Sequence, residues 1–285
     1  MDYHYPAPRS PEGYSSVVAA PQSDLRWLGL GRLSLGAEGA RYSSHSQGDE
    51  MGIDILGGVC QVSLKGSWGE ARYPQVGQRA DPFSGPPSMV YVPRGTEVTI
   101  TCLSAPLSAA LVRAPSRRET APRLIPADKA PFEAFGRDNW QRGVYLSIGP
   151  EVDADRIIMG ETHTPSGNWS SYPPHKHDTD TAHERACEEI YHFLFDPSHG
   201  FGLQYLWTAP GHPEPPIQAA YPLHNGDTVA IPRGYHPTVV APGCRMITVW
   251  AYAGENRGWR HWTPEPALER LLRPPEGFGS VEGAT

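Results

Sequence analysis

The stretch Pro173-Pro-His175-Lys-His177-Asp178, followed by Glu188-Glu189-Ile-Tyr191 and then by Pro232-Arg-Gly-Tyr-His236-Pro237, carries the strongest signal in the chain. Residues two apart on a β-strand point to the same side, so His175 and His177 can bind one ion while the lysine between them points away. A carboxylate at the start of a second strand and a third histidine after a turn complete the donor set. Imidazole and carboxylate donors suit Zn, Mn, Fe, Co or Ni, and such a set leaves coordination positions open for substrate oxygens.

Two glutamates compete for the carboxylate position. Glu189 is favoured because strand alternation puts it on the same face as Tyr191 and Phe193, and Glu188 is the second choice. Three further histidines are close in sequence, and each is interpreted as a loop residue or an outward strand residue rather than a ligand; they are His183, His192 and His199.

Short runs rich in Val, Ile, Leu, Tyr and Trp recur along the chain between clusters of Gly, Pro and Asp. The 30 Gly and 31 Pro among 285 residues favour many turns and few long helices. This pattern of short apolar runs separated by turn residues is typical of a β-barrel or a β-sandwich. One helix is expected, over Pro264 to Leu272, because its leucines share a face. The predicted strands cover residues 52–64, 89–103, 144–148, 156–162, 189–195, 201–207, 227–232 and 245–253.

The chain length fits two domains better than one. The segment from Val90 to Ile100 matches the segment from Val229 to Val239 at an offset of 139 positions, which favours two similar halves. We therefore predict an all-β, two-domain chain: an N-terminal barrel over residues 1–113, a Pro- and Arg-rich linker over 114–131, and a C-terminal barrel over 132–285 that holds the metal and ends in the short helix.

The N-terminal domain is predicted to lack a metal. At the offset of 139 positions, Glu97 corresponds to His236 and Glu50 to Glu189, whereas the two other histidines have no histidine counterpart. Carboxylates alone do not rebuild an imidazole site.

Composition excludes several classes of partner. The formal charge of −7, with no basic run, argues against nucleic acid and against an anionic membrane surface. Neither a signal peptide nor a transmembrane segment is found, and four widely spaced cysteines fit reduced thiols. We expect a cytoplasmic protein with a small-molecule partner, and the sequence leaves open whether it forms a homo-oligomer.

With these motifs the chain resembles the cupin superfamily, and within it the family of 5-deoxy-glucuronate isomerase and 5-keto-4-deoxyuronate isomerase of bacterial inositol catabolism. The segments that carry the resemblance are 167–180, 188–191, 200–201 and 232–237. The resemblance implies a bicupin of two β-barrel or jelly-roll domains and an aldose–ketose isomerisation of a deoxy sugar acid. It also implies a set of metal ligands, namely His175, His177, Glu189 and His236.

Such a reaction moves a hydrogen between adjacent carbons, either through a positioned acid or base or as a hydride shift. Tyr235 and Glu188 are candidates for the proton carrier, and Arg233 is a candidate carboxylate clamp. The alternative, a packing tyrosine and two solvated charged side chains, stays open.

Two strands depart from the pattern of the family. The runs 203–207 and 247–250 lack an arginine and an asparagine that the family typically carries there. We expect Gln204, Tyr205, Trp207 and Trp250 to line the substrate pocket and to make it more aromatic, unless these positions face outward. Two other functions are therefore kept: a divergent metal-cupin enzyme of another class (oxygenase, lyase or secondary-metabolite tailoring enzyme) and a non-catalytic sugar-binding cupin.

Overall fold

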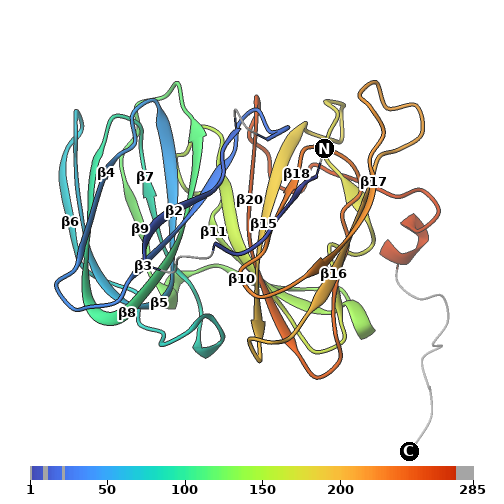
Figure 1. Cartoon of the computed structure of the whole chain (residues 1–285). Coiled ribbons are helices and arrows are strands. Elements are labelled where there is room, and N and C mark those ends of the chain that lie inside the picture. Colours follow the sequence, from blue (N-terminus) through green and yellow to red (C-terminus); the bar gives the residue numbers. More distant parts are fainter. Residues whose placement is uncertain (1, 9–11, 21–22, 274–285) are drawn as a thin grey trace, which may run out of the picture.

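The computed structural model describes residues 2–8, 12–20 and 23–273. Over these residues the chain consists of strands and a few short 3-10 helices, without an α-helix, which confirms the predicted all-β class. Two barrel-shaped units lie side by side, the first drawn in blue to green and the second in yellow to red (Figure 1). Among the described segments, no helix has both the length and the apolar character that crossing a bilayer requires.

The first unit is an antiparallel sheet organised around two long strands, β5 and β8, which pair from Asp49 with Pro115 to Lys65 with Glu97. Alternate residues of β5, such as Met51, Ile53 and Ile55, are fully buried inside the unit, and the residues between them are buried as well, since this part of the strand is covered on both faces. The strands of this sheet are β2 (Gly13–Val18), β3 (Gly29–Leu35), β4 (Arg41–His45), β5 (Asp49–Gly66), β6 (Gly69–Val76), β7 (Ser88–Val92), β8 (Glu97–Pro115) and β9 (Arg123–Ile125).

The second unit contains a seven-stranded sheet, a four-stranded sheet and a two-stranded pair. The strand order of the large sheet is β1-β18-β15-β20-β12-β11-β10 and that of the smaller one is β13-β19-β16-β17. The strands are β1 (His4–Tyr5), β10 (Phe132–Phe135), β11 (Arg142–Ile148), β12 (Ile158–Thr164), β13 (Trp169–Ser170), β14 (His175–Lys176), β15 (Cys187–Asp196), β16 (Gly202–Trp207), β17 (Gln218–Leu223), β18 (Thr228–Ile231), β19 (Thr238–Val240), β20 (Arg245–Gly254) and β21 (Thr263–Pro264).

Strands β15 and β20 form the middle of the large sheet and pair along their whole length, from Cys187 with Gly254 to Asp196 with Arg245. Both are rich in β-branched and aromatic residues and are buried almost throughout, as expected for central strands. They provide a rigid support for the side chains of the candidate site.

Each of the eight predicted strand segments contains a strand. The helix expected over Pro264 to Leu272 does not form as predicted. Pro264 ends β21, and only the 3-10 helix η5 (Glu269–Leu272) follows. The reason is local: Pro266 has no N–H to donate, and a residue that precedes a proline is disfavoured in the helical conformation. The other short 3-10 helices are η2 (Pro82–Ser84), η3 (Ala127–Lys129) and η4 (Asp138–Trp140).

Chain segments cross between the two units in both directions. β1 belongs to the sheet of the second unit, where His4 pairs with Val229 of β18, and Figure 1 marks the N-terminus beside this strand. Segment 114–131, the predicted linker, includes β9, which pairs with β7 of the first unit. Residues from both units also contribute to one continuous hydrophobic core along the surface where the units meet.

Candidate metal centre

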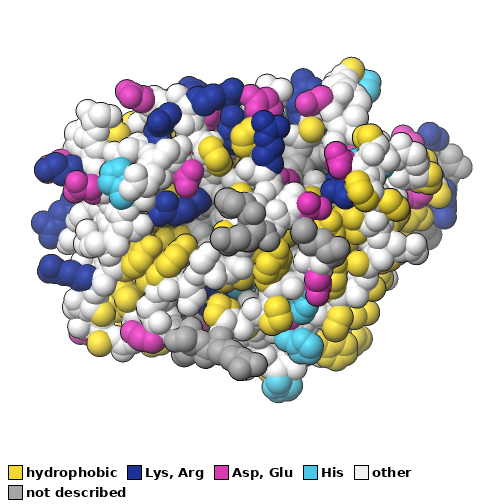
Figure 2. Space-filling model, turned by 45° about the horizontal axis from the view of Figure 1, so that its top comes forward, with side chains coloured by type: hydrophobic (Ala, Val, Ile, Leu, Met, Phe, Trp, Pro, Cys, Tyr) yellow, Lys and Arg dark blue, Asp and Glu magenta, His cyan; other side chains and the backbone are white. Residues whose placement is uncertain are grey.

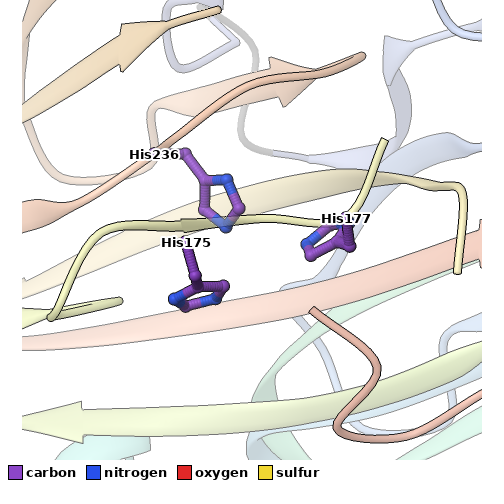
Figure 3. Close-up of side chains that lie close together, drawn as sticks. All are labelled: His175, His177 and His236. Carbon is purple, nitrogen blue, oxygen red and sulfur yellow. The ribbon is translucent and has the colours of Figure 1, made fainter. Parts of the chain in front are cut away.

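Three histidine side chains meet at one end of the second unit. His175 is the first residue of β14, which pairs with β21, and His177 follows directly after β14. His236 lies after the turn that follows β18. One ring nitrogen from each histidine lies within 4.8 Å of those of the other two. Figure 3 shows the three rings around a common space. The structure thus brings together the three histidines that the sequence predicted as ligands.

Backbone carbonyls fix the orientation of all three rings through the Nδ1 atoms. His177 Nδ1 lies 2.9 Å from the carbonyl oxygen of Cys187, and His236 Nδ1 lies 2.8 Å from that of Gly234. His175 Nδ1 lies 3.2 Å from the carbonyl oxygen of Pro173. A carbonyl only accepts hydrogen bonds, so each Nδ1 carries a proton, and Nε2 is the ring nitrogen that each histidine could offer to a metal. Metal-binding histidines are oriented in the same way.

Glu189 on β15 joins the cluster. Its Oε2 atom lies 3.1 Å from His177 Nε2 and 3.2 Å from His236 Nε2. Burial alone would raise the pKa of this carboxyl, but the two imidazoles outweigh that effect and hold the pKa at about 2, so Glu189 is a carboxylate at neutral pH. Strand alternation places Tyr191 on the same face, as the sequence predicted.

The donor set fits a divalent transition metal. The Nε2 atom of His236 is buried, and although Glu189 Oε2 lies 3.2 Å away, it makes no well-aligned hydrogen bond with a described residue, which is costly unless another ligand fills the gap. Burial and the neighbouring imidazoles hold the pKa of His175 well below its ordinary value, so that ring is neutral and able to coordinate. Three imidazole nitrogens and one carboxylate oxygen are ligands that Zn, Mn, Fe, Co and Ni accept.

An ion network outside the cluster holds the loop that carries the histidines. Lys176 points away from the cluster, and its Nζ lies 2.6 Å from Asp178 Oδ1 and 2.8 Å from Glu184 Oε1. Asp178 also accepts a hydrogen bond from the backbone N–H of Gly234, at 2.8 Å. The loops of His177 and His236 are therefore tied together.

The cluster opens into a cavity of about 370 Å³. His175, His177 and Glu189 are part of its lining, and many of the other lining residues are aromatic. Trp250 and Tyr252 of β20 stack in series with Trp259, with ring centroids 5.5 and 5.6 Å from Trp250. Residues with charged or hydroxyl groups also line the cavity, namely Arg137, Arg142, Thr162, Ser170, Ser171, Tyr172, Tyr191 and Tyr252.

Tyr191 is the one residue of β15 with a hydroxyl group, and its ring lies beside the histidine cluster. Its ring packs edge-on against His236, with centroids 5.7 Å apart, and its hydroxyl lies 2.6 Å from Ser171 Oγ. Burial and the charge of Glu189 raise the pKa of Tyr191 well above its ordinary value, so the hydroxyl keeps its proton. It is therefore available as a hydrogen-bond donor beside the cluster.

The structure does not bring the three candidate catalytic residues into this cavity. The Tyr235 ring packs on Trp207, with centroids 5.2 Å apart, outside the cavity lining. Arg233 donates to the carbonyl oxygen of Pro215 at 2.9 Å and forms an ion pair with Asp24. Glu188 points to the opposite face of β15, because neighbouring residues of a strand alternate.

Of the four residues predicted to line the substrate pocket, only Trp250 lines this cavity. Gln204 is fully buried, and its Nε2 donates to the carbonyl oxygen of His236, which puts it behind that ligand. Tyr205 and Trp207 stack on each other at 4.5 Å and line a separate hollow on the outer face of β16. These two strand departures therefore add one aromatic side chain to the cavity, not three.

Sequence reasoning missed Arg142, Tyr252, Trp259 and Trp262. They come from three separate parts of the chain, and no local motif joins them. Tyr252 could have been predicted from Trp250, because it follows two residues later on β20 and therefore lies on the same face of the strand.

Comparison with known proteins identifies relatives over nearly the whole chain. The model of the KduI/IolB family matches residues 6–270. The 5-deoxy-glucuronate isomerase of Geobacillus kaustophilus is 32% identical over 254 residues, which cover 88% of this chain and 89% of that protein. The enzyme of the same name from Bacillus subtilis strain 168 is 31% identical and covers 95% of this chain and 99% of its own length.

Solved structures show the same fold. An IolB-like protein from Salmonella typhimurium LT2 superposes with a TM-score of 0.88 at 27% identity, covering 96% of this chain and all of that one. Oxalate decarboxylase from Bacillus subtilis superposes with a TM-score of 0.62 at 13% identity, covering 88% of this chain and 74% of its own. The second likeness concerns the fold alone, and it supports the two-cupin architecture.

Proposed function

Since the chain belongs to the KduI/IolB family, we propose that it is a metal-dependent aldose–ketose isomerase that acts on a deoxy sugar acid of the 5-deoxy-glucuronate type. One observation carries the proposal. The Nε2 atoms of His177 and His236 lie 3.1 and 3.2 Å from the carboxylate of Glu189, and a ring nitrogen of His175 lies within 4.8 Å of a ring nitrogen of each, beside a cavity. That arrangement suits a metal with open positions facing a small substrate.

We propose that His175, His177, Glu189 and His236 hold one divalent transition metal, with Zn, Mn, Fe, Co and Ni all chemically suitable. When bound, such an ion acts as a Lewis acid toward carbonyl and hydroxyl oxygens of a substrate. The neutral His175 ring and the ionised Glu189 carboxyl already have the protonation states that coordination requires.

The residues of the chain have distinct roles in this proposal. Tyr191 donates a hydrogen bond to a substrate oxygen and is held in place by Ser171. The aromatic walls formed by Trp250, Tyr252 and Trp259 exclude water, which strengthens hydrogen bonds and charge interactions inside the cavity. Tyr191 thereby takes the role for which Tyr235 and Glu188 were candidates.

The composition of the cavity supports a sugar acid as the substrate. Arg142 contributes a positive charge, and hydroxyl groups come from Thr162, Ser171 and Tyr191. With Tyr205 and Trp207 outside the cavity, its walls keep polar partners for a polyhydroxy acid, so neither the divergent metal-cupin enzyme nor the sugar-binding cupin is favoured.

We also propose a cytoplasmic enzyme of inositol catabolism whose partner is a small molecule rather than nucleic acid or membrane. Basic and acidic side chains are interspersed on the face shown in Figure 2, as the sequence charge pattern suggested.

A time course by NMR tests the function. The metal-loaded protein should convert 5-deoxy-glucuronate to the corresponding ketose, while His175→Ala, loaded and assayed identically, should not. Absence of any conversion by a protein that carries a full equivalent of metal would contradict the proposal and favour another reaction class.

A further inference from the structure

Arg142 is a half-buried cation without an acidic partner. It opens β11, lines the cavity of the candidate metal centre, and lies over the ring of Phe135 at 5.8 Å. Among the described residues no carboxylate lies within ion-pairing distance of its guanidinium, whereas Arg79, also buried, is bound by Glu161 and Asp54.

Only the Nη1 atom of the Arg142 guanidinium donates hydrogen bonds to described residues. Nη1 donates to the carbonyl oxygens of Trp140 at 3.2 Å and of Tyr172 at 3.0 Å. The other edge, formed by Nε and Nη2, donates to no acceptor in the described part of the chain. Arg245 uses this same edge to bind the carboxylate of Asp196. An arginine presents two parallel N–H groups along this edge, which matches the two oxygens of a carboxylate.

The charge of Arg142 persists in this environment. Burial lowers the pKa of the guanidinium to about 10, which still leaves it protonated at neutral pH. A partly desolvated cation without a counter-ion is unfavourable, and an anion that enters the cavity relieves that cost.

The position of Arg142 relative to the histidines is also favourable. Tyr191 packs against His236 on one side, and its hydroxyl feels the charges of both Glu189 and Arg142. The residue whose carbonyl binds Nη1, Tyr172, lies three positions before His175. Arg142, Tyr191 and His175 line the same cavity, so one small molecule inside it can contact the arginine and the histidine cluster together.

We propose that the free Nε and Nη2 edge of Arg142 binds the carboxylate of the substrate and so sets both the specificity for acids and the orientation of the carbon chain. This inference rests on the proposed function and deepens it. The other arginine of the cavity is less suited, because Arg137 donates through both Nη atoms to the carbonyls of Arg273 and Leu271, and its Nε lies 4.0 Å from Asp138 Oδ2. Arg142 thereby replaces Arg233, the carboxylate clamp expected from the sequence.

Equilibrium binding tests the carboxylate preference without relying on turnover. D-glucuronate and D-glucose, which differ by a carboxylate against a hydroxymethyl group, are titrated into the full-length protein by calorimetry, metal-loaded and after metal removal. In the metal-free titration, the carboxylate of D-glucuronate cannot bind to the ion, so any preference that remains comes from the protein. The wild type should bind D-glucuronate at least about 10-fold more tightly than D-glucose, the order of one charge-assisted contact.

Three variants assign that preference to one residue. Arg142→Met should abolish it, Arg142→Lys should restore part of it, and Arg137→Met, the matched control from the same cavity, should retain it. Metal content is measured for each variant, because Arg142 also binds the backbone of Tyr172 close to His175. A wild-type protein without preference for D-glucuronate, or a preference that survives in Arg142→Met, overturns the proposal.

Turnover then separates this inference from the function itself. With 5-deoxy-glucuronate, Arg142→Met should raise KM about 10- to 100-fold while keeping its metal. If the wild type isomerises the acid and Arg142→Met does so with unchanged KM, the role of Arg142 is wrong and the isomerase stands. If the wild type does not isomerise it but the Arg142-dependent preference persists, the role of Arg142 stands and the isomerase is wrong.

Discussion

Glu50 and Glu188 make the same contact in opposite directions across the interface between the two units. The carboxylate of Glu188 on β15 accepts hydrogen bonds from the backbone N–H groups of Arg26, Trp27 and Leu28 at 2.5 to 2.6 Å. The carboxylate of Glu50 on β5 accepts the corresponding bonds from residues 155–157 at 2.6 to 2.7 Å. Each unit thus holds a loop of the other.

This reciprocity predicts that both glutamates stabilise the assembly of the units. Glu188→Ala and Glu50→Ala each leave three N–H groups without their acceptor, and each should lower the free energy of unfolding by about 2 to 4 kcal/mol. Urea denaturation of the two variants measures the change. Glu97→Ala, at an exposed position on β8, is the control and should change the free energy of unfolding by less than about 0.5 kcal/mol. Equal stability of all three variants would contradict the interface role.

The metal-ligand assignment predicts a sharp division between the units. His175→Ala and His236→Ala should each lose most of the bound metal while the fold is kept, because too few donors remain. Glu50→Gln and Glu97→Gln should keep a full equivalent. Elemental analysis after dialysis measures metal content, and circular dichroism verifies the fold. A full equivalent of metal in either histidine variant, or a loss in either glutamine variant, would show that the ligands are misassigned.

The meeting of the three histidines with Glu189 could be predicted from the sequence because strand geometry is local. Two histidines separated by one residue share a face, and the parity of β15 distinguishes Glu189 from Glu188. The same rule explains an error in the internal comparison. The offset of 139 positions aligned Glu50 with Glu189, but by its contacts Glu50 is the counterpart of Glu188, and a register difference of one residue moves a side chain to the other face.

The residues that form the walls of the cavity could not be predicted from the sequence, because their positions depend on pairings between distant strands. Arg142 reaches the cavity from β11, Trp259 and Trp262 from a segment more than one hundred residues later, and no short-range pattern connects them. The pairing of β1 with β18 is another contact of this kind, since only the tertiary structure brings His4 to Val229. Tyr235 directly precedes His236 in sequence but packs on Trp207 outside the cavity, so adjacency within a motif does not place a side chain in the same space.

Tyr191 and Tyr235 give a direct test of the role proposed for the hydroxyl group in the cavity. Tyr191→Phe removes a hydrogen-bond donor beside the cluster and should lower kcat on 5-deoxy-glucuronate about 10- to 100-fold with metal content unchanged. Tyr235→Phe removes a hydroxyl outside the cavity and should leave kcat within about twofold. Steady-state kinetics of both metal-loaded variants decides between them. The reverse pattern would restore Tyr235 as the catalytic candidate.

A buried ion cluster between the units predicts how stability depends on pH. Arg79 of the first unit donates through both Nη atoms to the carboxylate of Glu161 on β12, and a single longer contact of 3.5 Å joins it to Asp54. Burial alone would raise the pKa of Glu161, but Arg79 outweighs that effect and lowers the pKa to about 2. Burial and the charge of Glu161 raise the pKa of Asp54 well above its ordinary value, so Asp54 holds a proton.

The sign of the pH effect follows from Glu161, whose pKa is lower in the folded than in the unfolded protein. Its contribution to the free energy of unfolding is complete above pH about 4.5 and is lost as the pH falls toward 2, a change of roughly 2 to 3 kcal/mol. Glu161→Gln should therefore destabilise the protein at pH 7 and flatten the acid dependence. Asp54→Asn, which resembles a protonated aspartate, should cost far less at pH 7. Urea titrations of both variants between pH 7 and 3 measure these free energies, and a larger loss at pH 7 for Asp54→Asn would reverse the assignment of the proton.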